Sequence, residues 1–252
     1  MKFIGIDLAW SYRNNTAVSI LELHSIKKSV NLVDYAERLE SDEEIIDYVS
    51  KNVDKGACVS IDAPLIVKNR TGARPVDREV SARYRKYFAG AHPCNLNKFK
   101  GKVRGNELFK KLTELGFEHN PYISISKRRR ITNIIIEVYP HPAQVVLFKL
   151  RKRVLYKRGD VETKRKGLLR LRRYIVERLP NTEPRLNVNH KLQDLCTRSI
   201  QAMRGKSLKN YEDTLDSLIC AYVGLYHWYW GNEKSEVIGD LQTGYIVTPK
   251  SR

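Results

Sequence analysis

Short apolar runs separated by polar turns divide the first quarter of the chain into four predicted strands. A helix lies between the third and fourth strands, because Ser41 and Glu44 form a capping box and an apolar face continues to about Asn52. Pro64 ends the fourth strand. The four strands are expected at residues 2–9, 16–23, 29–35 and 57–62.

The rest of the chain is predicted to be mainly helical. One further apolar strand is expected at 133–139, and 243–248 is a candidate edge strand. Helices are expected at 75–89, 104–116, 141–150, 162–179, 190–204 and 211–230. This order predicts an α/β fold, in which a mixed sheet (a three-strand meander, a helix and further strands) is flanked by helices.

Length and composition fit a single domain over residues 1–252, with basic helical insertions at 64–130 and 149–209. The chain is 42% hydrophobic, which is enough to bury a core, and it has no internal repeat or low-complexity linker. No apolar run approaches the roughly 18–20 residues of a membrane helix, and Asp7 comes too early for a signal peptide. We therefore expect a cytoplasmic protein with no membrane partner.

Positive charge is concentrated in two blocks. The chain carries 46 Lys and Arg against 28 Asp and Glu, a net charge of +18. Residues 64–130 hold 17 basic and 5 acidic residues, net +12, and residues 149–178 hold 13 and 3, net +10. Either block alone fits a solvated helix face. Two blocks that flank one apolar strand favour a shared groove for a polyanion, and nucleic acid is the expected partner.

Three predicted strands each carry one carboxylate at or near the C-terminal end: Asp7, Asp62 and Glu137. An Asp that ends a strand is often a turn residue. Glu137 lies within an apolar run, where a buried carboxylate needs a cation, a hydrogen-bond donor or solvent. An arginine partner would satisfy it as well as a metal ion.

The predicted last helix adds Asp213 and Asp216, which are three residues apart and share one helix face. Acids in a first turn also complement the helix dipole. If this helix packs across neighbouring strands, all five carboxylates converge, and such a cluster requires divalent cations such as Mg²⁺ or Mn²⁺. Two ions about 4 Å apart would activate a water molecule and stabilise the leaving oxygen of a phosphodiester.

The order of these motifs resembles the RNase H-like fold, and YEDTLDSLICAYVG at 211–224 resembles a helix of Holliday-junction resolvases. Actin-like ATPases share this topology, but LAWSYRNNT after Asp7 lacks the glycine of their phosphate turn. A closer resemblance is to the family domain of unknown function 429, described as predicted nucleases of RNase H-like fold. It implies that fold and a metal site at the five carboxylates. It rests on GIDLAW, IDAPL, RPVD, EVYPHPA, KRKGLLRL, YEDTLDSLICAYVG and GYIVTP.

Several basic residues are candidate nucleic-acid contacts. Arg74 either pairs with Asp77 or contacts a phosphate. A helix face that interleaves basic residues with Tyr84 and Tyr87 either grips phosphates and stacks a base or buries its tyrosines. His141 is either a proton shuttle or metal ligand, or a residue that begins a helix. The remaining candidate contacts are Arg83, Arg85, Lys86, Lys127, Arg128, Arg129 and Arg130.

The sequence therefore predicts a metal-dependent nuclease. The alternative is a catalytically inactive RNase H-like protein that binds nucleic acid or takes part in an assembly. Retention of all the expected acids favours the enzyme, because an inactive binding protein tends to lose them. DNA and RNA substrates, and a monomer and a homo-oligomer, all fit this pattern.

Overall fold

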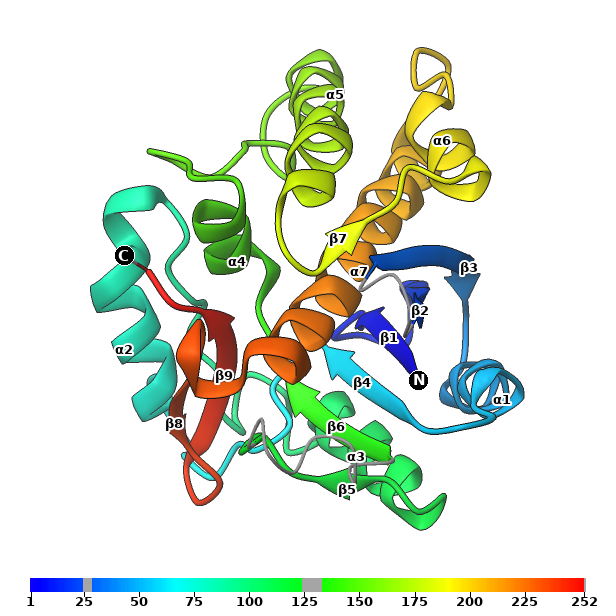
Figure 1. The fold of residues 1–252 in the computed structure, drawn as a ribbon. Helices are drawn as coiled ribbons and strands as arrows, with labels where there is room; N and C mark the ends of the chain where they lie inside the picture. Colours follow the sequence, from blue (N-terminus) through cyan, green and yellow to red (C-terminus); the bar gives the residue numbers. More distant parts are fainter. Residues whose placement is uncertain (25–28, 124–132, 252) are drawn as a thin grey trace.

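A seven-stranded mixed sheet forms the centre of the computed structural model, which describes residues 1–24, 29–123 and 133–251 (Figure 1). The strand order is β5-β6-β4-β1-β2-β3-β7. β1, β2 and β3 form an antiparallel meander, and β4 and β6 extend the sheet in parallel from β1. This arrangement confirms the predicted α/β, RNase H-like fold class. The strands are β1 (Lys2–Asp7), β2 (Thr16–His24), β3 (Ser29–Leu39), β4 (Ala57–Ile61), β5 (Glu118–His119), β6 (Asn133–Glu137) and β7 (Arg185–Leu186).

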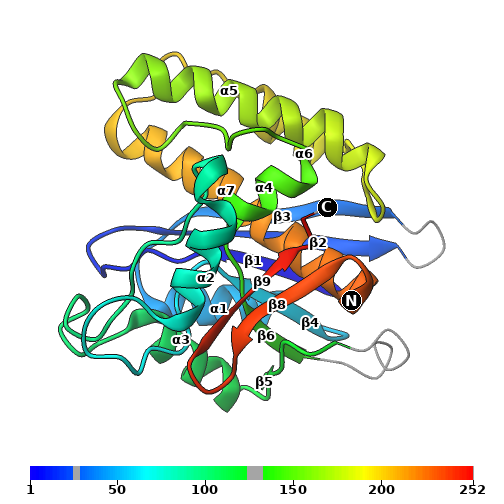
Figure 2. The same ribbon diagram turned by 90° about the vertical axis from the view of Figure 1, so that its left-hand side faces the viewer.

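Helices cover both faces of this sheet (Figure 2). Side chains alternate along each strand, so Phe3 and Ile134 pack against one helical layer, whereas Ile4 and Ile135 pack against the other. The first layer consists of α4 (Pro140–Leu147), α5 (Val161–Arg178), α6 (His190–Thr197) and α7 (Gly205–Trp230), and the second of α1 (Asp42–Asn52) and α3 (Arg104–Glu114). Within the described ranges, no helix has the length and apolar character needed to cross a membrane.

The tail of the chain does not join the central sheet as an edge strand, contrary to the expectation for 243–248. It forms β9 (Gly244–Pro249), which pairs with β8 (Ser235–Asp240) in a separate antiparallel hairpin. α2 (Pro75–Tyr84) packs against this hairpin through Val76 and Val80, which share an apolar cluster with Ile238 and Ile246. β8 was not expected, because its short sequence SEVIGD mixes charged residues, glycine and apolar residues.

Several helix boundaries also differ from the sequence expectation. α2 ends at Tyr84 rather than near 89, and α4 ends at Leu147 rather than near 150. α6 ends at Thr197, seven residues before the expected end at 204. α7 begins at Gly205 rather than near 211, because Arg204 N donates to Ser207 Oγ at 3.0 Å and starts the helix within a polar segment that has no apolar stripe. The predicted cap of α1 is present, with Glu44 N donating to Ser41 Oγ at 3.1 Å.

α7 crosses β1 and β4 in close contact, and glycines make this approach feasible. A Cβ atom on Gly5 would lie 2.0 Å from Ser217 O and 2.2 Å from Ala221 N. A Cβ atom on Gly224 would lie 2.1 Å from Ser60 Oγ. Because α7 runs antiparallel to β1, this contact brings the N-terminal half of α7 to the C-terminal ends of β1 and β4.

We predict that Gly5→Ala lowers the free energy of unfolding by about 1–3 kcal/mol or more, since the new methyl group must displace the α7 backbone. Urea unfolding measures this change. Ala82→Ser, at an exposed position of α2, is the control and is expected to change stability by less than about 0.5 kcal/mol. Wild-type stability of the Gly5→Ala variant would contradict the close contact.

Candidate active site

Asp7 and Asp62 are neighbours at one edge of the sheet. Ile6 pairs with Ile61 in the parallel register of β1 and β4, and Asp62 N donates to Ile6 O at 2.8 Å. The two acids end adjacent strands, which lie about 4.8 Å apart. Their carboxylates therefore belong to the same small region of the surface.

α7 brings Asp213 and Asp216 to the same region, where their side chains are buried, with 6% and 0% of their surface exposed. Burial raises the pKa of both carboxyls, and the negative charge of Asp7 raises each further. Burial, followed by repulsion from Asp7, likewise raises the pKa of Asp62 well above its usual range. Asp7, Asp62, Asp213 and Asp216 thus form one electrostatic unit, the carboxylate cluster.

A lysine that the sequence did not single out is paired with this cluster. Lys157, in the segment between α4 and α5, places Nζ 2.7 Å from Asp216 Oδ2. Burial acts to lower the pKa of Lys157, but Asp216 and Asp7 outweigh it and raise that pKa well above its usual value. The other oxygen of Asp216 accepts from Tyr156 OH at 2.6 Å and from Gln144 Nε2 at 3.3 Å. Both oxygens of Asp216 are therefore engaged.

Asp213 has a more exposed partner. Lys209, one turn earlier on α7, donates to Asp213 Oδ1 and lies 3.1 Å from Glu212 Oε1. Its side chain is 55% exposed, so solvent competes for this ion pair. We infer that Lys209 is displaced from Asp213 more readily than Lys157 is displaced from Asp216.

The cluster offers suitable oxygen ligands for a hard cation. Asp7 Oδ2 is buried and has no hydrogen-bond partner among the residues that the structure describes. An unpaired buried carboxylate oxygen is unfavourable unless a cation or proton joins it. No three His, Cys, Asp or Glu side chains in the described ranges already surround a metal position. Carboxylate oxygens are the donors that Mg²⁺ or Mn²⁺ prefers, but in this arrangement a metal ion would be bound only if the side chains of Asp7, Asp62 and Asp213 reoriented.

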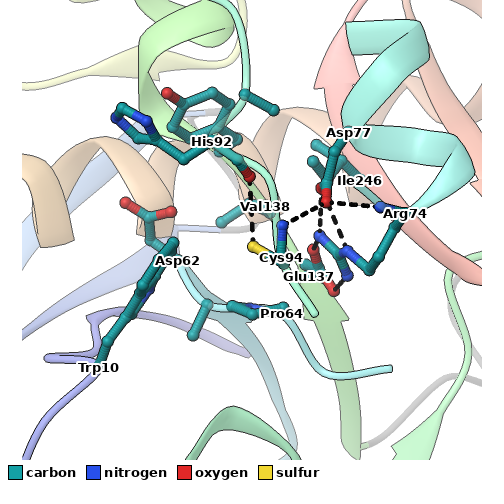
Figure 3. A pocket seen from close by; sticks show the side chains of 13 residues that line it. Trp10, Asp62, Pro64, Arg74, Asp77, His92, Cys94, Glu137, Val138 and Ile246 are labelled. Atoms are coloured by element: carbon teal, nitrogen blue, oxygen red, sulfur yellow. Dashed lines mark hydrogen bonds and ion pairs between the residues drawn. The ribbon is translucent and has the colours of Figure 1, made fainter. Parts of the chain in front are cut away.

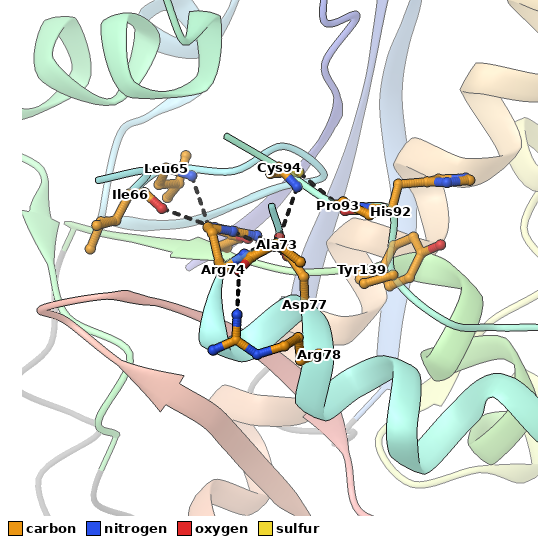
Figure 4. A network of polar contacts seen from close by, with 12 residues as sticks. Leu65, Ile66, Ala73, Arg74, Asp77, Arg78, His92, Pro93, Cys94 and Tyr139 are labelled. Carbon is orange, nitrogen blue, oxygen red and sulfur yellow. Dashed lines mark hydrogen bonds and ion pairs between the residues drawn. The ribbon is translucent and has the colours of Figure 1, made fainter. Parts of the chain in front are cut away.

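Glu137 instead lies in a second polar group with Arg74 and Asp77, the Arg74 network (Figure 3). Figure 4 shows Arg74 and Asp77 of this network from another side. Arg74 Nη2 and Nη1 donate to the two Glu137 oxygens at 2.7 and 3.0 Å, and Leu65 N donates to Glu137 Oε2 at 2.8 Å. Arg74 Nε and Nη2 donate to Asp77 Oδ1 at 3.1 and 2.9 Å. Arg74 is only 2% exposed and forms ion pairs with Asp77 and Glu137. It therefore does not make the expected phosphate contact.

One pocket connects the carboxylate cluster to the Arg74 network. Figure 3 shows Trp10, Asp62 and His92 on one side of this pocket and the Arg74 network on the other. Trp10 is 39% exposed, in the loop that follows β1. The pocket therefore gives solvent a route to the Asp62 side of the cluster.

The candidate contacts Arg83, Arg85 and Lys86, which the structure describes, form no ion pair with these acids. Arg83 pairs with Glu79 and with Glu236, the latter at 2.8 Å. Arg85 and Lys86 are exposed, whereas Tyr84 is buried in the apolar cluster of α2. The expected contacts Lys127, Arg128, Arg129 and Arg130 lie outside the described residues.

His141 is buried near the start of α4, with Nδ1 2.9 Å from Tyr139 OH. Burial, reinforced by the charge of Lys157, lowers the pKa of His141 well below its usual value. Its burial in the first turn of α4 fits the interpretation of a residue that begins a helix.

The residues in contact with the carboxylate cluster that sequence reasoning missed are Lys157, Lys209, Tyr156 and Gln144. Lys157 is one of 13 basic residues in the block 149–178, and no local spacing distinguishes it from the others. Lys209 is three residues before Glu212 and four before Asp213 on α7. That i, i+3, i+4 spacing is the one signal by which this lysine was detectable.

We predict that Glu137→Gln lowers the free energy of unfolding by about 3–5 kcal/mol, because it leaves the buried Arg74 with one of its two carboxylates. Urea unfolding measures the change. Glu236→Gln, which removes a partner of the half-exposed Arg83, is the matched control and should cost less than about 1 kcal/mol. Equal small losses in both variants would show that the Arg74 network contributes little.

We also predict that the metal-free protein loses stability as the pH rises. The pKa of Asp213 is raised to about 9, mainly by burial and by Asp7, so the folded protein retains a proton that the unfolded chain releases near pH 4. This contribution is complete below about pH 4 and is lost as the pH rises through about 9. Asp213→Asn should flatten the profile measured by urea unfolding in EDTA.

The difference between the pH profiles of the wild type and Asp213→Asn isolates the contribution of Asp213, because His119 and His227 titrate in the same way in both proteins. Burial lowers the pKa of each of these histidines to about 4, and their contribution changes with the opposite sign. Parallel profiles for the wild type and Asp213→Asn would show that the cluster carries no such charge strain.

No curated protein and no solved structure matches the chain. One family does match, described as protein of unknown function (DUF429), over residues 5–240. This range includes Asp7, Asp62 and all of α7, and therefore the whole carboxylate cluster. Because the match spans most of the 252 residues, the chain belongs to the DUF429 family.

Proposed function

We propose that this protein is a divalent-metal-dependent nuclease that hydrolyses phosphodiester bonds of DNA or RNA. The observation that carries the proposal is the convergence of Asp7, Asp62, Asp213 and Asp216 from two adjacent strands and one helix. A protein of net charge +18 that gathers four acids in one place combines attraction for a polyanion with ligands for a cation. The RNase H-like strand order supports the same assignment.

Each part of the site has a role in this proposal. Asp7, Asp62 and Asp213 hold Mg²⁺ or Mn²⁺, with the unpartnered Asp7 Oδ2 as the first ligand. When bound, such an ion lowers the pKa of a water molecule and offsets charge on the phosphate. The basic residues of 64–130 and 149–178 neutralise the backbone phosphates on either side. A cytoplasmic location is part of this proposal.

A specific observation favours a second candidate function, nucleic-acid binding without turnover. Lys157 and Lys209 already pair with Asp216 and Asp213, so the chain supplies its own positive charge to the cluster. A protein that only binds nucleic acid would use these lysines to keep the cluster neutral. Metal-dependent stabilisation distinguishes the two functions, because the binding protein would show none.

We predict that Asp7→Asn reduces Mn²⁺-dependent cleavage to the background rate while nucleic-acid binding is retained. The substitution removes one ligand and one negative charge, so metal affinity falls. It also relieves repulsion within the cluster, and stability in EDTA should be unchanged or higher. Cleavage of labelled single-stranded, duplex and branched DNA and RNA, with thermal melts in EDTA and in Mn²⁺, measures these effects.

Asp194→Asn is the matched control, since Asp194 is 57% exposed and pairs with His190 on the surface of α6. This variant should behave as wild type in every assay. If the wild-type protein neither cleaves any of these substrates nor gains stability from Mn²⁺, the nuclease proposal fails and the binding protein is the correct assignment.

A further inference from the structure

Lys157 is held in place more firmly than a surface ion pair requires. Its Nζ atom lies 2.7 Å from Asp216 Oδ2, and its side chain is 26% exposed, whereas Asp216 is fully buried. Tyr156 OH and Gln144 Nε2 donate to the other Asp216 oxygen and also bond to each other at 2.6 Å. Asp216 is therefore fixed in the orientation that receives Lys157.

The backbone that carries Lys157 is also constrained. α5 approaches this segment so closely that a Cβ atom on Gly167 would lie 2.1 Å from Leu155 O and 2.9 Å from Tyr156 Cα. Tyr156 itself is buried in the main core. Both the backbone and the carboxylate partner thus position the ammonium group of Lys157 beside the carboxylate cluster.

The remaining carboxylates are sufficient for one ion. Of the five acids that the sequence nominated, Glu137 is neutralised by Arg74 and Asp216 by Lys157. Asp7, Asp62 and Asp213 are left, and the partner of Asp213 is the exposed Lys209. Three carboxylates, completed by water and substrate oxygens, suit a single Mg²⁺ or Mn²⁺.

We propose that Lys157 takes the place of a second metal ion, so that the active site binds one divalent cation and uses the Lys157 ammonium group as its second positive charge. This inference rests on the proposed nuclease function. An ammonium group has three donors, and Asp216 accepts from one, which leaves donors for an oxygen of the bound phosphodiester. Lys157 would thus be a catalytic residue that binds the reacting phosphate.

The number of bound ions tests this inference without reference to cleavage. Equilibrium dialysis against Mn²⁺ measures ions per folded chain for the wild type and for Lys157→Met, which preserves length and removes the charge. We expect about one ion in the wild type and about two in Lys157→Met, because Asp216 then becomes available. Lys157→Arg should retain one ion. Lys209→Met, the matched control beside Asp213, should also retain one.

Each number of bound ions either supports or overturns the proposed role of Lys157. Two ions in the wild type, or one in a folded Lys157→Met variant, would overturn the role of Lys157 while leaving a metal-dependent nuclease in place. If Lys157→Met does not fold, the wild type and Lys157→Arg decide: one ion in each supports the inference, and two in either overturns it. No ion in the wild type would reject the proposed function together with this inference.

Discussion

The contact between α7 and strands β1 and β4 is the constraint on which the rest of the structure depends. Gly5 and Gly224 leave no room for a Cβ atom at this contact. Beside it, Ser19 Oγ of β2 lies 2.7 Å from Ser217 Oγ of α7. A larger residue at these positions would raise the helix from the sheet. Asp213 and Asp216 would then move away from the acids that end the strands.

This constraint creates an electrostatic problem, because it brings four carboxylates into a region of limited solvent access. Burial and mutual repulsion raise the pKa values of Asp62, Asp213 and Asp216. Among the described residues, two lysines offset this repulsion: the half-buried Lys157 pairs with Asp216, and the exposed Lys209 pairs with Asp213. A site of this kind favours the arrival of a further cation, and this preference connects the fold to the proposed chemistry.

Glu137 is also a buried carboxylate, but an arginine pairs with it. Its strand, β6, lies beside β4, so that Glu137 pairs in register with Ile61, immediately before Asp62. Arg74 arrives from the start of α2, donates to both oxygens of Glu137 and is itself completed by Asp77. The Glu137 carboxylate therefore connects the start of α2 to the sheet through Arg74. Sequence position alone made Glu137 and Asp62 equivalent, whereas their surroundings separate a structural acid from a candidate ligand.

The sequence by itself determined the fold class, because apolar periodicity defines strands and helices. It also singled out the acids of the cluster together with Glu137, because a carboxylate that ends an apolar strand is conspicuous. It also identified Asp213 and Asp216 through helical spacing. Only the tertiary structure decided which cation meets which acid. Arg74 is 63 residues from Glu137, and Lys157 is 59 residues from Asp216. Pairings over such separations depend on how segments pack, and local residue patterns carry no information about that packing.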